Sequence, residues 1–512
     1  MNAALTAPGA RLVSNSRWNL FAFAFSLAAQ FVTVPFVIRW IGLPAFGQAG
    51  LVLAIWAPLM LVGVVLGQAT TRQVSTQLAD ADQDAATRVL ATALWMCLAA
   101  CALGGAALMI AGPALLSAIA AGSQARATLQ LAFVIAGAGW AAQQLALVLQ
   151  GATMARQDYR KVAQVAAFSS AAAVGLTLAL TSATPTVEGY LSGVAASFAA
   201  TLLAWLWIGY RGGRGALAWP RWHRPEALRL LHFGKWQSLA QLAGAFGNQI
   251  DRYALGALAP VAVIGQYNAA NRLQEAAYMG VMKGGEILFP HFGATSGAPL
   301  AERQSFFVTS SWVVATLSVV FLAPLVPLSH SLLLLWAGAE TADGGALLLR
   351  TLVLGGIVGC GSNVFSYYAM GIGENAPLAW LSVLYSLLTI VATIALMRTF
   401  GPYAAGAGLL VASFGRVAAA LWLTRQRFFP ALPWGDLIVS SVLPLAVGSG
   451  LALALHAAGA GEVTSWVSLI GSYVSVAAAV LLATMALTLP WRTGREIVSR
   501  VASAMRRREP AR

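Results

Sequence analysis

Charged residues are scarce in this chain of 512 residues, of which Asp, Glu, Lys and Arg together make up only 9%. Hydrophobic residues supply 59%. A soluble domain carries about 25% charged residues, so the composition excludes an ordinary soluble fold and predicts a protein that crosses a membrane many times. The apolar runs have the length of membrane helices and lack the short alternation of barrel strands, so we expect an all-α protein.

Several chemical signatures are also missing. The three cysteines, at positions 97, 101 and 360, lie in apolar runs without a paired ligand set. The five histidines show no HExxH spacing, and no GxxxxGK[ST] phosphate-binding loop occurs. These absences argue against a disulfide framework, a zinc site and an ATPase within this chain. We therefore expect a protein that is not an enzyme and has no metal or other cofactor.

The apolar runs predict about fourteen transmembrane helices. We place them at residues 19–38, 48–68, 89–110, 128–150, 162–182, 189–210, 236–257, 263–288, 306–330, 350–370, 377–397, 405–424, 436–456 and 465–489. This assignment leaves almost no room for a soluble domain. The longest connections are the loop at 211–235 and the tail after residue 490, and both are basic.

The net charge of +14 is distributed unevenly across the predicted spans. Of the 31 Lys and Arg residues, four fall on one side (Arg39, Arg126, Arg350, Arg398), four fall within spans (Arg252, Arg272, Lys283, Arg416) and the other 23 share the opposite side. By the positive-inside rule both termini are cytoplasmic. The basic tail suits anionic lipid head groups, whereas nucleic-acid binding would need a basic surface with interleaved aromatics that the sequence lacks.

Two distant segments of the chain match at a constant offset of 218 residues. Arg17-Trp18-Asn19 aligns with Lys235-Trp236-Gln237, and Phe46-Gly47-Gln48 aligns with Ile264-Gly265-Gln266. Polar positions between these anchors coincide as well, in the pairs Asn19/Gln237, Ser26/Gly244, Gln30/Asn248 and Thr33/Asp251. Their spacing places each set on one helical face, which should turn toward a cavity or a partner helix and away from lipid.

The offset covers six spans, so the two copies enter the membrane in the same direction. We expect an N-lobe of helices 1–6 (1–210), a basic cytoplasmic linker (211–235), a C-lobe of helices 7–12 (236–427), and two additional helices with a basic tail (428–512). A substrate path would then run between two pseudo-symmetric six-helix lobes. We also expect a monomer.

Six charged residues lie on the seventh and eighth predicted spans: Asp251, Arg252, Arg272, Glu275, Lys283 and Glu286. Each would cost about 2.5 to 3.5 kcal/mol at the centre of a lipid-facing helix, so most must face protein or a polar cavity. Arg272 with Glu275, and Lys283 with Glu286, have the spacing of ion pairs on one helix. The sequence leaves open whether these pairs form or whether the cations bind substrate.

A cavity lined by Arg and Lys suits an anionic substrate, because the guanidinium group matches phosphate oxygens. We take Arg252, Arg272 and Lys283, with the polar residues Asn248, Gln30 and Gln237, as candidate binding residues. Asp251 is a candidate for proton or sodium coupling, or it orients a neighbouring cation. Glu275, Glu286 and Arg416 are secondary candidates, and Arg416 could equally be a snorkelling or helix-pairing residue.

Three stretches resemble one family of transporters. The segment "GLPAFGQAG" after the first span, the block "NQIDRYALGALAPVAVIGQYNAANRL" and the "ILFP" ending of the eighth span are similar to the polysaccharide-transporter branch of the multidrug/oligosaccharidyl-lipid/polysaccharide exporter superfamily. That branch contains the O-antigen and capsular repeat-unit flippases of bacterial inner membranes. The matching motifs are concentrated in residues 17–48 and 235–290.

The resemblance implies transport of a polyprenyl-pyrophosphate-linked oligosaccharide, a repeat unit of O-antigen lipopolysaccharide, capsule or exopolysaccharide, from the cytoplasmic to the periplasmic leaflet by alternating access. The cationic cavity of that family matches Arg252, Arg272 and Lys283, and the two glutamates depart from it. Partners would be the lipid-linked oligosaccharide, membrane lipids, and a polysaccharide polymerase with its chain-length machinery. Alternatives are a cation-coupled multidrug and toxin extrusion-type exporter or a peptidoglycan-precursor flippase; a membrane glycosyltransferase or polymerase is less favoured.

Overall fold

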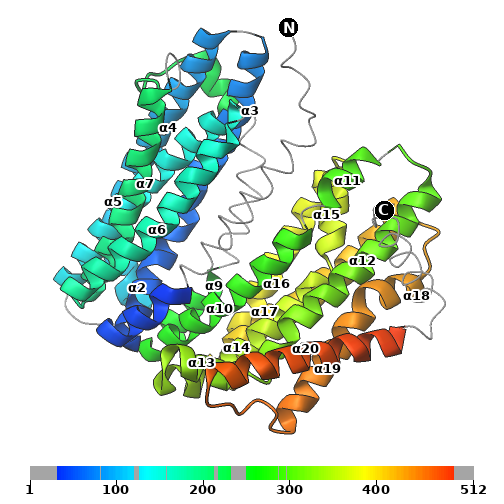
Figure 1. The fold of residues 1–512 in the computed structure, drawn as a ribbon. Helices are drawn as coiled ribbons and strands as arrows, with labels where there is room; N and C mark the ends of the chain where they lie inside the picture. The colour runs from blue at the N-terminus through cyan, green and yellow to red at the C-terminus, as the bar shows by residue number, and fades with distance from the viewer. Residues whose placement is uncertain are drawn as a thin grey trace, which may run out of the picture. The chain divides into compact units, whose positions relative to one another are not determined.

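The computed structural model describes residues 31–80, 82–119, 126–156, 158–212, 217–231, 249–285, 288–295 and 297–488. Every regular element within these ranges is a helix, which confirms the all-α prediction (Figure 1). The chain divides into two compact units, Met1–Ala257 and Leu258–Arg512. The short helix α9 (Ile250–Leu258) therefore belongs to the first unit except for its last residue. The lobe boundaries drawn from the sequence stay a prediction.

The first unit is a bundle of long helices. They are α2 (Leu43–Trp56), the 3₁₀ turn η1 (Ala57–Met60), α3 (Leu61–Ala79), α4 (Gln83–Ile119), α5 (Arg126–Ala155), α6 (Tyr159–Ala183) and α7 (Val187–Arg211).

Close packing of α3 on α5 depends on glycine. A Cβ atom on Gly151 would lie 2.3 Å from the carbonyl oxygen of Gly67. The Thr71 hydroxyl donates to the carbonyl of Gly151 at 3.0 Å, and Gln144 Oε1 accepts from the backbone N–H of Gly63 at 2.7 Å. Small residues thus let the two backbones approach, as is common between membrane helices.

The second unit contains more and shorter helices. They are α10 (Val261–Gly285), α11 (Leu288–Ala294), α12 (Leu300–Leu322), η2 (Ala323–Leu325), α13 (Ser329–Ala337), α14 (Ala339–Cys360), α15 (Asn363–Gly371), α16 (Asn375–Phe400), η3 (Pro402–Ala404), α17 (Ala405–Leu423), the π-helical turn η4 (Thr424–Phe428), α18 (Trp434–Leu437), the π-helical turn η5 (Ile438–Val442), α19 (Leu443–Ala457) and α20 (Trp466–Thr488). An aromatic cluster packs in its core, with Tyr368 edge-on to Phe292 and Phe307 and tilted against Phe429.

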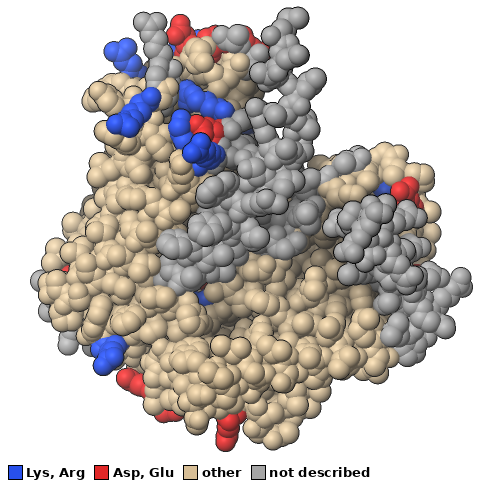
Figure 2. Space-filling view, in the orientation of Figure 1, with Lys and Arg blue, Asp and Glu red and all other residues tan. Residues whose placement is uncertain are grey.

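Eleven helices in the described residues are long and apolar enough to cross a membrane. Predicted spans 19–38 and 236–257 lie mostly outside the described residues. The span at 263–288 falls on α10, which is helical but too polar to qualify by composition. Figure 2 shows broad surfaces without charged side chains on the face drawn. These features support a multi-pass membrane protein; the count of fourteen stays a prediction.

One predicted span is displaced. The sequence placed it at 350–370, whereas α14 runs from Ala339 to Cys360, the chain turns at Gly361 and Ser362, and α15 follows. Arg350 therefore lies in the middle of a helix and not at the outer end of one. The displacement arose because the first turns of α14 contain Glu340 and other polar residues, which lower the local hydropathy although the chain is helical.

Candidate functional site

The charged pair that opens α9 separates into two environments. Asp251 is buried, with only 8% of its surface exposed, and Arg252 is half-buried. Arg252 Nη1 donates to Oε1 of Gln249, one helical turn earlier. Consecutive helical residues point about 100° apart, which explains how two adjacent charges reach different surroundings.

Tyr253 fixes α9 within the first unit. Its hydroxyl donates to the backbone carbonyl of Ala54 in α2 at 2.7 Å. A membrane helix rarely leaves a carbonyl open to an outside donor, but Ala54 lies just before the chain tightens into η1, where the hydrogen-bond pattern of the helix changes. The position of Asp251 and Arg252 is therefore set by a specific contact between helices.

Several predicted site residues lie outside the described residues, namely Gln30, Gln237, Asn248 and Glu286. The backbone of Lys283 belongs to α10, but its side chain is not among those that the structure describes. Their roles stay predictions.

The polar residues of α10 divide into two groups. The first group holds α10 to its neighbours. Gln266 Nε2 donates to the carbonyl of Glu340 in α14 at 2.8 Å, and the Tyr278 hydroxyl donates to Oδ1 of Asn363 in α15 at 3.2 Å. In a bilayer such bonds substitute for the water that a soluble protein would use, so these two residues contribute to packing within the unit.

The second group includes the charged residues predicted from the sequence. Glu275 is exposed on the surface of α10 and accepts a hydrogen bond from Asn271 Nδ2 at 2.7 Å. Arg272, which directly follows Asn271, is half-buried. A neutral amide thus contacts the carboxylate of Glu275, and the two groups lie one turn apart, as their i,i+4 spacing predicts.

Arg416 lies near the middle of α17 and is half-buried. Its guanidinium carbon stands 5.2 Å from the centre of the Tyr385 ring in α16. Within the described part of the chain, its Nε is buried without a hydrogen-bond partner and no carboxylate lies within ion-pair distance.

Two polar contacts lie inside the second unit, Arg416 with Tyr385 and Tyr278 with Asn363. We refer to these four residues as the polar cluster. The sequence singled out Arg416 alone, because a single charge is visible in an apolar run. The other three come from three different helices, and no spacing along the chain relates them. Guanidinium, hydroxyl and amide groups are the kinds of group that bind a ligand that is both anionic and rich in hydroxyls.

Comparisons with known structures agree on the architecture. The chain is similar to the lipid II flippase MurJ in an inward closed conformation, with a TM-score of 0.74, 10% identity, and coverage of 93% of this chain and 99% of that one. It is also similar to an inward-facing multidrug resistance MATE family transporter of the MOP superfamily, with a TM-score of 0.68, 15% identity, and coverage of 80% and 94%. These identities establish the fold alone.

A third similar structure is a MOP superfamily transporter from Pyrococcus furiosus, at a TM-score of 0.58, 15% identity, and coverage of 81% and 95%. No curated protein sequence matches significantly. Residues 12–296, more than half of the chain, match the family described as polysaccharide biosynthesis protein. The chain therefore belongs to the polysaccharide biosynthesis protein family, and its fold is that of the MOP superfamily transporters.

Proposed function

We propose that this protein is a flippase that moves a polyprenyl-pyrophosphate-linked oligosaccharide from the cytoplasmic to the periplasmic leaflet of a bacterial inner membrane. The observation that carries the proposal is the polar cluster of the second unit. Arg416 has no acidic partner among the described residues, although an unpaired charge in a membrane helix costs about 2.5 to 3.5 kcal/mol. A pyrophosphate group would supply the missing negative charge.

The other residues of the polar cluster suit the remainder of such a ligand. Tyr385 offers an aromatic face, while Tyr278 and Asn363 offer a hydroxyl and an amide. Sugar hydroxyls are recognised by groups that both donate and accept hydrogen bonds, and aromatic faces pack against their C–H surfaces. Membership of the polysaccharide biosynthesis family supports a saccharide-bearing substrate.

A cation-coupled drug exporter would require the opposite electrostatics, with carboxylates free to receive a cationic compound. Among the described charges of α9 and α10, Glu275 is contacted by Asn271, while Asp251 is buried in the first unit. We propose that Asp251 serves coupling to protons or sodium during alternating access and does not bind the transported molecule.

The decisive experiment follows the lipid-linked glycans of cells depleted of this protein. Mass spectrometry identifies the glycans, and a membrane-impermeant lectin reports their leaflet. Accumulation of a completed repeat unit in the cytoplasmic leaflet would support the proposal and identify the cargo.

Other outcomes would replace the proposal. Accumulation of peptidoglycan precursor would assign that substrate to the protein. Truncated glycans would indicate a transferase, and unchanged glycans together with altered sensitivity to cationic compounds would indicate a drug exporter.

A further inference from the structure

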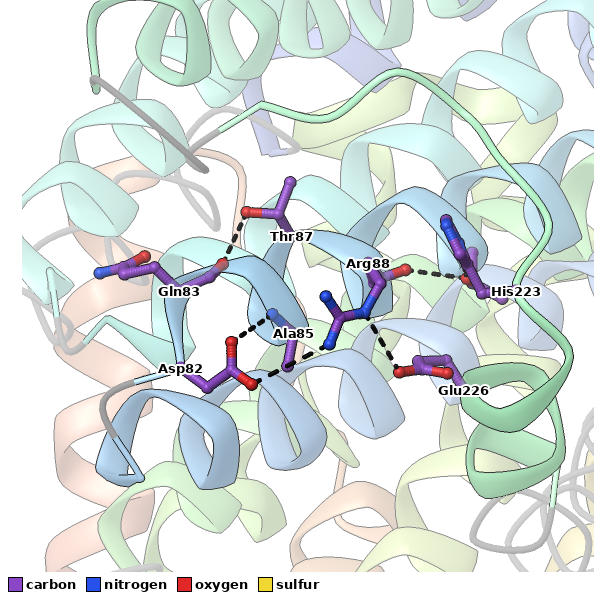
Figure 3. Close-up of polar contacts among 8 residues, drawn as sticks. Asp82, Gln83, Ala85, Thr87, Arg88, His223 and Glu226 are labelled. Atoms are coloured by element: carbon purple, nitrogen blue, oxygen red, sulfur yellow. Dashed lines mark hydrogen bonds and ion pairs between the residues drawn. The ribbon is translucent and has the colours of Figure 1, made fainter.

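The segment at 217–231, which follows α7, lies against the beginning of α4 (Figure 3). The backbone N–H of Arg221 donates to the carbonyl of Ala91 at 3.1 Å. The hydroxyl of Thr92 lies 3.2 Å from Nδ1 of His223. These contacts join two parts of the chain that are about 130 residues apart in sequence. The segment is therefore held to the first unit along the first turns of α4.

The only carboxylate of this segment is already neutralised. Glu226 is buried, and its Oε1 lies 3.7 Å from Nε of Arg88 in α4, whose Nη2 also lies 3.9 Å from Asp82 (Figure 3). The arginines of the segment, at 221, 224 and 229, are exposed. The exposed surface of segment 217–231 thus carries positive charge alone.

The same surface is rich in large apolar side chains. Trp219 is 82% exposed, Leu228 is 58% exposed, and Trp222 and Leu231 are half exposed. Leu228 and Leu231 share one face of the helix at 224–231, because they are three residues apart. The adjoining face of that helix is buried through Ala227 and Leu230. An apolar face beside a basic one is the pattern of a helix that lies in a membrane surface.

The position along α4 also places the segment at a membrane boundary. The docking contacts involve Ala91 to Trp95, eight to twelve residues inside the start of α4, or roughly 12 to 18 Å along its axis. Trp95 is itself exposed, and its ring stands 4.9 Å from that of Trp222. Tryptophans gather where the hydrocarbon meets the head groups, so this pair indicates the interface at the predicted cytoplasmic side.

We propose that segment 217–231 binds the cytoplasmic leaflet, with Trp219, Trp222, Leu228 and Leu231 in the lipid boundary and the three arginines on anionic phospholipid head groups. The positive charge of the segment favours anionic lipid over the C-terminal tail of this chain as its binding partner. The tail beyond residue 490 carries seven arginines against two glutamates, so it would not complement a basic surface. Segment 217–231 would then move together with the first unit during the transport cycle.

Spin labels can test the depth of the segment in the full-length protein. The native cysteines at 97, 101 and 360 are buried. They are replaced by alanine, and single cysteines are then introduced as Leu228→Cys and Arg229→Cys. In membranes containing phosphatidylglycerol, we expect the label at 228 to collide mainly with oxygen, which dissolves in lipid. The label at 229, on a different face of the helix, should collide mainly with a water-soluble nickel complex.

Two outcomes would overturn the proposal. Equal access of the nickel complex to both labels would place the segment in water. A label at 228 reached by neither reagent would show that protein covers this face.

The anionic preference is tested separately with lipids retained by the purified protein. The double variant Arg224→Gln/Arg229→Gln should lose most of its enrichment of phosphatidylglycerol over phosphatidylcholine in native mass spectrometry. The control variant Arg160→Gln/Arg398→Gln removes the same charge from exposed positions outside the segment and should keep the enrichment. Equal enrichment in the two variants would refute the assignment of the arginines. Neither readout depends on the transported substrate, so both stand apart from the proposed function.

Discussion

Replacing Arg416 with methionine separates a ligand-binding role from a structural one. Methionine is shorter than arginine, but it has the same unbranched stem and it removes the charge. Among the described residues, the guanidinium lies 5.2 Å from the centre of the Tyr385 ring, and its buried Nε has no hydrogen-bond partner. A buried guanidinium with a purely structural role is expected to have a carboxylate or several hydrogen-bond acceptors around it. We therefore expect stability and transport to change in opposite directions.

The magnitude follows from two terms. An arginine at the centre of a membrane helix costs about 2.5 to 3.5 kcal/mol. The contact with Tyr385 returns about 0.5 to 2 kcal/mol, depending on how far the pair is removed from water. The difference predicts that Arg416→Met raises the free energy of unfolding by about 0.5 to 3 kcal/mol.

The assay measures both quantities for each variant. Thermal unfolding of the purified protein reports stability, and accumulation of lipid-linked glycan in depleted cells reports transport at matched protein levels. Arg416→Met should unfold at a higher temperature and transport poorly, while Arg416→Lys should transport at an intermediate level because it keeps the charge but loses the planar fork. Arg398→Met, at the exposed end of α16, is the matched control and should change neither. A less stable Arg416→Met protein with normal transport would refute the reasoning.

Three further predictions concern packing and can be measured by thermal unfolding. Gly151→Ala should destabilise the protein by about 1 to 3 kcal/mol, because the new methyl group would meet a carbonyl of α3. Gly175→Ala, with open space around the new methyl group, should stabilise the protein by about 0.5 to 1 kcal/mol. Equal effects of the two substitutions would contradict the close approach of α3 and α5. Tyr253→Phe should cost about 1 kcal/mol through loss of its hydrogen bond to α2, and an unchanged melting temperature would show that the bond does not hold α9. Arg88→Ala should lower the free energy of unfolding by about 1 to 3 kcal/mol, because it leaves Glu226 buried and unpaired. The loss should be larger than that caused by Glu226→Gln. A larger loss for Glu226→Gln would show that Glu226 does not depend on Arg88.

Hydropathy predicted the membrane class and most helices because lipid imposes one strong rule, that backbone groups must be satisfied within the helix. The same rule explains the failures. The hydropathy pattern missed the first three turns of α14, because Glu340 and the polar residues near it lower the local hydropathy. These turns pack against protein, since Gln266 of α10 donates to the Glu340 carbonyl. A helix packed inside a protein can begin with polar residues at little cost.

Among the described residues, candidate site residues could be predicted only where a charge interrupted an apolar run. Asp251, Arg252, Arg272 and Arg416 were predicted in this way, and their roles stay predictions. Tyr385 could not be identified, since a tyrosine in a membrane helix is unremarkable until the fold places an arginine above its ring.

Charge in a membrane helix indicates function only when the protein does not already compensate it. On α10, Glu275 accepts a hydrogen bond from the Asn271 amide, and Gln266 donates to a carbonyl of α14, so the polarity of these residues is explained by the fold. Arg416 differs, because the described residues provide it with an aromatic face but no negative charge. A guanidinium that the described residues leave without a negative charge lowers stability, so Arg416 supports the proposal that a bound ligand supplies the opposite charge.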